Sequence, residues 1–166
     1  IKDRDTFPLL FVRENCADMA VEASRIDESF IADCRALLIT GTHLSTPTVR
    51  AASLAALGFA GQHGTTRVLD IDYRPVLWGL TKRGEGANRF VADAAVTERL
   101  QAVLPQFDLL IGTEEEFLIA GGVAGDLLAN LRRVREVTAA AMVVKLGAKG
   151  CCFIDGAVPS RRKPLR

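Results

Sequence analysis

The stretch RVLDIDYRP, residues 67–75, passes from apolar to charged within a few residues. Its first part contains Val68, Leu69 and Ile71, and such β-branched and apolar residues are typical of a buried strand. Asp72 and Arg74 follow at once, and Pro75 stiffens the exit. The stretch therefore predicts a buried strand over Arg67–Ile71 that ends in a charged loop.

Similar short runs occur on both sides of this stretch, among them ALLIT, DLLI and MVVKL. Runs that are apolar over four or five residues are typical of central strands with helices on both faces. Longer helical patterns separate them, as in βα units, so the sequence predicts an α/β fold with a mostly parallel sheet and helices on both faces. The predicted strands are Leu9–Arg13, Ala36–Thr40, Arg67–Ile71, Asp108–Ile111, Met142–Leu146 and Cys151–Ile154.

Three segments between the strands have an apolar stripe at helical spacing. They are Thr48–Leu57, with Thr46 as its cap and Gly58 as its end, Ala92–Leu104, and Ala124–Val137.

Composition favours a small-molecule partner. The chain has 166 residues, of which 49% are hydrophobic, so one domain with a sizeable core is expected. Its 21 basic and 20 acidic residues nearly cancel, which argues against nucleic acid or an anionic membrane as a partner. No apolar run is long enough to span a bilayer and no signal segment opens the chain, so a cytoplasmic location is expected.

The four cysteines have no metal-ligand spacing, and we expect them to be reduced thiols in the core. They are Cys16, Cys34, Cys151 and Cys152. The chain opens on Ile1 rather than Met, which suggests a sequence entered partway.

Ligands of open α/β sheets bind at the carboxyl ends of the strands, and those positions are polar in this chain. The first candidate site is Asp72 with Arg74. A guanidinium suits a carboxylate or a phosphate, and Asp72 can orient it or accept a hydroxyl. A plain surface loop would also explain these charges.

The second candidate is GTEEEF, residues 112–117. One interpretation is a capping box, in which Thr113 and Glu116 bond to each other's backbone at the start of a helix. The other is that Glu116 holds Mg²⁺ through water beside the phosphates of a nucleotide. The two interpretations are compatible.

The third candidate is KLGAKG, residues 145–150. Gly147 and Gly150 allow a backbone to approach a nucleotide closely, and Lys145 can reach its phosphates. A hairpin turn also explains these glycines, and the chain has no Walker loop. Two weaker candidates are Arg13, at the end of the first predicted strand, and His43. A plain loop also explains Arg13, and His43 is more typical of a strand-end hydrogen-bonding residue than of a base.

Taken together, FVRENCADMA, LLITGTHLSTP, LDIDYRPVLWG, LLIGTEEEF and VVKLGAKGC resemble, in order and spacing, the ribokinase-like (PfkB) carbohydrate kinases, over roughly residues 7 to 155. The resemblance implies a ribokinase-like fold, with residues 1–166 as the central part of one kinase domain. The family's Asp-x-Asn-x-Arg pattern falls on Asp70, Asp72 and Arg74, with Asp in place of Asn, and its Asn-x-x-Glu pattern falls on Thr113 and Glu116, with Thr in place of Asn.

What the resemblance implies about function is the ATP-dependent phosphorylation of a sugar acid, with ATP and Mg²⁺ as cofactors. Arg74, Asp72 and Arg13 would bind the substrate, and Thr113, Lys145, Gly147 and Gly150 would lie on the nucleotide side. Glu116 would contact the metal through water. The family's glycine-rich sugar-binding segment would precede Ile1. Its catalytic Asp base, in a Gly-Ala-Gly-Asp motif, would follow Arg166, so no catalytic base is expected in this chain and we expect it to be inactive alone.

Two other functions stay open. The chain can be a non-catalytic α/β binding module, and its exposed sheet edges can pair it into a homodimer. A Rossmann dinucleotide domain is the third interpretation, but no GxGxxG follows any strand.

Overall fold

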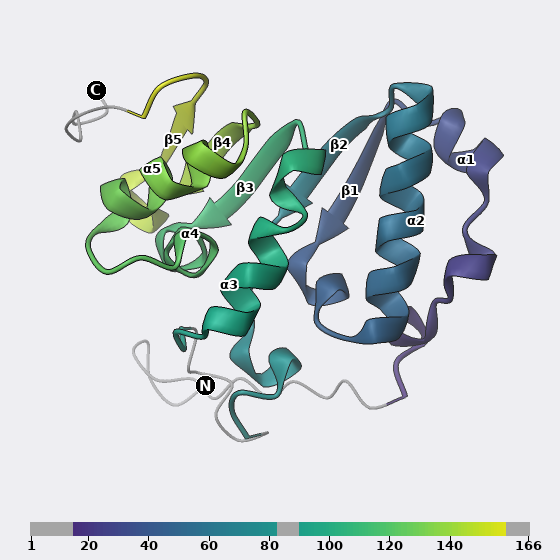
Figure 1. Ribbon diagram of the computed structural model, residues 1–166, viewed down its shortest axis with the longest axis horizontal. Helices are drawn as coiled ribbons and strands as arrows, with labels where there is room; N and C mark the ends of the chain where they lie inside the picture. Colours follow the sequence, from purple (N-terminus) through teal and green to yellow (C-terminus); the bar gives the residue numbers. More distant parts are fainter. Residues whose placement is uncertain (1–14, 83–89, 159–166) are drawn as a thin grey trace.

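The computed structural model describes residues 15–82 and 90–158. The predicted strand Leu9–Arg13, and with it Arg13, lies outside the described residues. In the described part, five strands form one sheet in the order β1-β2-β3-β4-β5. The first four are parallel, and β5 runs antiparallel to β4 (Figure 1). This confirms the predicted α/β fold with a mostly parallel sheet.

The strands are β1 (Ala36–Thr40), β2 (Thr66–Asp70), β3 (Leu109–Thr113), β4 (Ala141–Lys145) and β5 (Cys151–Ile154). The α-helices are α1 (Glu28–Ala32), α2 (Pro47–His63), α3 (Ala94–Gln101), α4 (Glu114–Gly121) and α5 (Leu127–Val137). Short 3₁₀ helices are η1 (Ala17–Ala20), η2 (Ala23–Arg25), η3 (Gly41–Leu44), η4 (Pro75–Trp78), η6 (Leu104–Gln106) and η7 (Gly147–Lys149).

Helix α2 is longer than the sequence predicts. It begins with Pro47 at its first position, as expected, but the Thr46 side chain makes no capping hydrogen bond. The expected end at Gly58 is wrong, because the helix continues through this exposed glycine to His63. It stops at Gly64, whose φ of 71° is the left-handed conformation that glycine adopts readily. The extra turns bury Ala60 against Ile31 of α1.

Helices α3 and α5 start later than predicted because aspartates cap them. Asp93 accepts the backbone N–H of Val96, and Asp126 accepts that of Ala129. A side-chain cap fixes where a helix begins, since it satisfies an N–H group that has no partner inside the helix.

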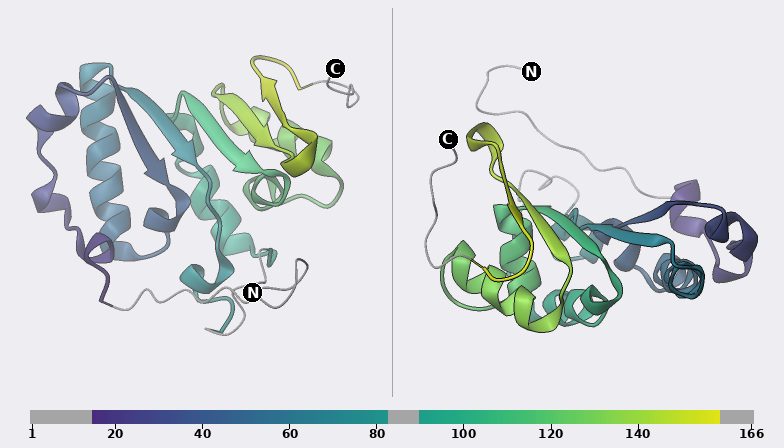
Figure 2. Two further views of the ribbon diagram at one scale, coloured as in Figure 1. Left: turned by 180° about the vertical axis from the view of Figure 1, so that it is seen from behind. Right: turned by 90° about the horizontal axis from the view of Figure 1, so that it is seen from above.

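The helices lie on one side of the sheet (Figures 1 and 2). Strand side chains that face them are buried, namely Ile39, Leu69, Leu110, Met142, Val144 and Ile154. On the opposite face, the side chains of Val68, Ile111 and Val143 are only half-buried, and those at the two edges are open. Leu38 of β1 is 58% exposed and Phe153 of β5 is 65% exposed. We call this the open face; the second predicted helix layer is not among the described residues.

β1 is an edge strand of the described sheet, whereas β2, β3 and β4 are interior as predicted. No disulfide joins the four cysteines, all of which lie in the described ranges, but placing them in the core was wrong. Cys151 is exposed and the other three are half-buried. Within the described ranges, no helix is long and apolar enough to cross a membrane.

Candidate functional site

Five charged side chains meet at the carboxyl ends of β2, β3 and β4. We call them the charged ring: Asp70, Asp72, Arg74, Glu116 and Lys145. Parallel strands present their carboxyl ends at one edge of a sheet, and this is where ligands of open α/β sheets bind.

The exit of β2 contributes three of the five. Asp70 is the last residue of the strand, and its Oδ1 accepts the backbone N–H of Asp72 at 3.2 Å. Asp72 has a φ of 32°, a left-handed conformation that Asp and Asn tolerate better than most residues. Its Oδ2 accepts a hydrogen bond from Thr42 Oγ1 of η3 at 2.9 Å, so the end of β1 also supports this turn.

Gly41 allows that support. A Cβ atom at this position would lie 2.0 Å from the carbonyl oxygen of Ile71, so only glycine lets the two strand ends approach so closely.

Arg74 joins the two carboxylates on either side of it. Its Nη2 lies 3.0 Å from Asp72 Oδ1, and its Nη1 donates to Glu116 Oε1 at 3.2 Å and to the carbonyl oxygen of Tyr73 at 2.8 Å. A guanidinium has five N–H donors, so these contacts do not exhaust it.

The Tyr73 side chain points into the core and is 1% exposed. Its hydroxyl donates to the carbonyl oxygen of Val91 at 2.6 Å. Burial, reinforced by the charge of Asp93, raises the pKa of Tyr73 to about 12. This tyrosine therefore anchors the loop that carries Arg74 and stays neutral.

Glu116 is the most buried member of the ring, at 4% exposure. The predicted capping box is confirmed: Glu116 Oε2 accepts the backbone N–H of Thr113 at 2.7 Å, and Thr113 Oγ1 accepts that of Glu116 at 3.3 Å. Its other oxygen faces Arg74. The Glu116 side chain thus caps the start of α4 and also binds Arg74 in the charged ring.

Lys145, the last residue of β4, completes the ring. Its Nζ lies 3.3 Å from both carboxylate oxygens of Asp70 and 4.0 Å from Glu116 Oε2. Gly147 and Gly150 belong to the exposed turn that follows, with φ of 59° and 86°. They lie beside the ring in sequence and make a tight turn in which Leu146 N–H donates to Gly150 O at 2.8 Å.

The ion pairs run in the order Asp72–Arg74–Glu116–Lys145–Asp70, so two cations alternate with three carboxylates, and the N–H of Asp72 joins the two ends through Asp70. Among the described residues, no group of three His, Cys, Asp or Glu side chains could hold a metal ion. Both oxygens of Glu116 already accept hydrogen bonds from the protein.

The structure thus brings together Asp72, Arg74, Thr113, Glu116 and Lys145, which the sequence predicts as separate candidates. His43 makes none of the ion pairs of the charged ring; its Nε2 lies 3.4 Å from Asp18 Oδ2. Thr42 has no role in the sequence prediction, and Asp70 appears there only as part of the family pattern, without a role of its own. Asp70 is the last residue of β2, and its side chain lies on the same face of the sheet as that of Lys145. The alternation of side chains along a strand is the sequence signal that could have indicated this.

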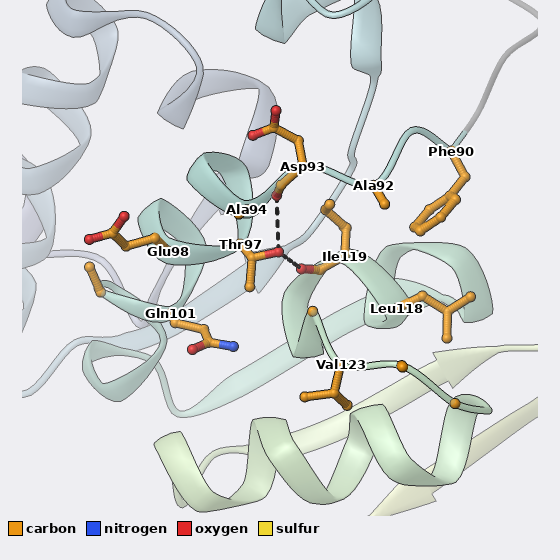
Figure 3. A pocket seen from close by; sticks show the side chains of 14 residues that line it. Phe90, Ala92, Asp93, Ala94, Thr97, Glu98, Gln101, Leu118, Ile119 and Val123 are labelled. Atoms are coloured by element: carbon orange, nitrogen blue, oxygen red, sulfur yellow. Dashed lines mark hydrogen bonds between the residues drawn. The ribbon is translucent and has the colours of Figure 1, made fainter.

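A separate pocket of about 820 Å³ lies between α3, α4 and the segment that follows α4 (Figure 3). In it Thr97 Oγ1 donates to the carbonyl oxygen of Ile119 at 2.7 Å. No member of the charged ring lines this pocket.

The described α/β fold is ribokinase-like, as its likeness to solved structures shows. In solved structures it matches the PfkB protein of Polaromonas sp. JS666, with a TM-score of 0.65 and 22% identity over 82% of this chain and 42% of that one. A candidate ribokinase II of E. coli, solved with ATP and Mg²⁺, matches with a TM-score of 0.65 and 18% identity over 81% of this chain and 39% of that one.

In sequence, the chain is similar to 5-dehydro-2-deoxygluconokinase. It is 33% identical to that of Geobacillus kaustophilus over 153 residues, which are 90% of this chain and 42% of the relative. The chain therefore spans less than half the length of the curated relatives it matches. No protein-family model matches the chain.

Proposed function

We propose that the chain is part of a cytoplasmic carbohydrate kinase. The reaction is transfer of the γ-phosphoryl group of ATP to the primary hydroxyl of a sugar acid, 5-dehydro-2-deoxygluconate, in inositol catabolism. The observation that carries this proposal is the charged ring, because it assembles separate sequence motifs at the sheet edge where α/β proteins bind ligands. The similarity to 5-dehydro-2-deoxygluconokinase over 90% of the chain supports the substrate.

On the substrate side, Arg74 has donors left for a carboxylate, and Asp72 has acceptor capacity for a sugar hydroxyl. Thr42 and Asp70 fix the conformation of Asp72. Arg13 is proposed as a further substrate contact.

On the nucleotide side, Lys145 would approach the phosphates, with Thr113 nearby and the turn of Gly147 and Gly150 allowing close backbone approach. Glu116 would bind Mg²⁺ through water. The ion would neutralise charge that develops on the transferred phosphoryl group. The contribution of these residues is to position ligands and to balance their charge.

A second function, a non-catalytic binding module, is favoured by the state of the carboxylates. General base catalysis requires a carboxylate that can reach the attacking hydroxyl and take its proton. Each carboxylate of the ring is already paired with a cation. We therefore propose that the chain alone is inactive. We also propose that residues 1–166 form the central part of a single kinase domain, whose catalytic Asp follows Arg166 in the complete enzyme.

Isothermal titration with Mg·ATP and with the sugar acid, together with a coupled kinase assay, tests these proposals. We expect the chain to bind at least one of the two ligands and to show no turnover. Turnover by the chain alone would refute its inactivity. Failure of the chain to bind either ligand would remove the support for a kinase site in it. An Arg74→Met variant with the same affinity for the sugar acid as the unaltered chain would have the same consequence.

A further inference from the structure

Asp70 contacts two parts of the charged ring at once. Both its oxygens lie 3.3 Å from Lys145 Nζ, and Oδ1 also accepts the N–H of Asp72. Asp70 pairs with Ile111 across the sheet, and Ile111 pairs with Val143, two residues before Lys145. Side chains two residues apart on a strand share a face. Asp70 and Lys145 therefore meet over β3, on the open face of the sheet.

Asp70 is the nearer of the two carboxylates around the Lys145 ammonium. The distance to Glu116 Oε2 is 4.0 Å, beyond a hydrogen bond, whereas both Asp70 oxygens are at 3.3 Å. The lysine side chain is 42% exposed and has four rotatable bonds, so without this contact it would sample many rotamers.

The second contact of Asp70 acts on the substrate side of the ring. Asp72 has a positive φ, which an L-residue adopts only with local support. The hydrogen bond from its N–H to Asp70 gives that support, and Asp72 in turn binds Arg74. One carboxylate thus sets the positions of Lys145 and of the turn that orients Arg74.

We propose that Asp70 is a positioning residue, which fixes the Lys145 ammonium above Glu116 before a ligand binds. The identity of that ligand, a nucleotide phosphate, rests on the proposed function; the fixed position of Lys145 does not.

The ligand-free test measures the rate at which a water-soluble acetylating ester modifies Lys145, read by peptide mass spectrometry. Lys149 is an internal control, because it lies four residues further on and is exposed. Asp70→Ala should raise the acetylation rate of Lys145, relative to that of Lys149, by about threefold, because this factor corresponds to the free energy of a partly exposed ion pair. Asp70→Asn keeps an acceptor oxygen and should give a smaller rise.

A matched control is Asp108→Ala, which removes a carboxylate that pairs with Arg67 at the opposite end of the sheet. It should leave the ratio unchanged. An unchanged ratio in Asp70→Ala would overturn the proposal. If circular dichroism shows that the alanine variant is unfolded, Asp70→Asn decides the matter in the same way.

The ligand-bound test is titration with Mg·ATP. Asp70→Ala and Lys145→Met should each weaken binding by about tenfold, and the double variant should be no weaker than Lys145→Met, since the two residues act as one unit. Tighter binding by Asp70→Ala would mean that Asp70 competes with the phosphate, and the proposal would be wrong. Absence of binding by the unaltered chain would count against the proposed function, while the labelling ratio would still decide the role of Asp70.

Discussion

Replacing Glu116 should destabilise the chain by an amount that depends on which of its bonds the new residue keeps. Glu116→Ala removes the capping bond to Thr113 N–H, which is worth about 1 kcal/mol. It also removes a charge-assisted bond from Arg74 in a site where Glu116 is 4% exposed, worth about 1.5 kcal/mol. Together with the lost packing of a buried side chain, the free energy of unfolding should fall by about 3 kcal/mol.

Glu116→Gln separates these contributions. Glutamine has a single carbonyl oxygen, which can keep the capping bond to the Thr113 N–H. Its NH₂ group then faces Arg74 and cannot accept from it, so the Arg74 bond is lost with the charge and the cost should be about 1.5 kcal/mol. Glu115→Ala is the matched control, because this exposed neighbour lies in the same first turn of α4, and its replacement should cost less than about 0.5 kcal/mol. Urea unfolding followed by circular dichroism measures all three. Equal losses for Glu116→Gln and Glu116→Ala would refute the idea that the capping bond to Thr113 contributes to stability.

Three further predictions concern single positions. Gly41→Ala should lower the free energy of unfolding by about 3 kcal/mol, because the new Cβ would lie 2.0 Å from a carbonyl oxygen. Gly58→Ala, in the exposed interior of α2, should instead raise it by about 0.5–1 kcal/mol. The midpoints of urea unfolding compare the two variants. The folded pKa of Tyr73 is about 12, above its ordinary value near 10. Its contribution to stability is therefore complete below pH 10 and is lost as the pH rises from 10 to 12. Tyr73→Phe should flatten this decline in a pH series of unfolding experiments. Burial alone would raise the pKa of Asp108, but hydrogen bonds from Arg67 outweigh this effect and lower the pKa. The stability that this pair contributes is therefore present above about pH 4 and lost below it. Asp108→Asn should remove that acid dependence.

The sequence predicts the strands well because each is a short apolar run with polar residues after it. β1 and β5 have the predicted bounds, and the others differ by one or two residues. It predicts the end of α2 poorly, because a glycine inside a helix costs only about 1 kcal/mol. Burial of Ala60 offsets that cost, and no pattern near Gly58 reveals this tertiary contact.

The candidate site shows the same division. Residues that follow strands were predicted individually, since their polarity stands out against the apolar runs. Their partners depend on which strands are neighbours, and a single sequence does not contain that register. Asp70 meets Lys145 only because β3 lies between β2 and β4, and Thr42 meets Asp72 only because Gly41 allows the strand ends to touch.

The open face of the sheet also determines how stability changes with temperature. Apolar surface that is already in water in the folded chain, such as Phe153 and Leu38, adds nothing to the heat capacity when the chain unfolds. The heat-capacity change per residue should therefore fall below the usual 12–15 cal/mol/K. A smaller value gives a flatter curve of stability against temperature, so cooling the chain should weaken it less than it weakens a sheet covered on both faces.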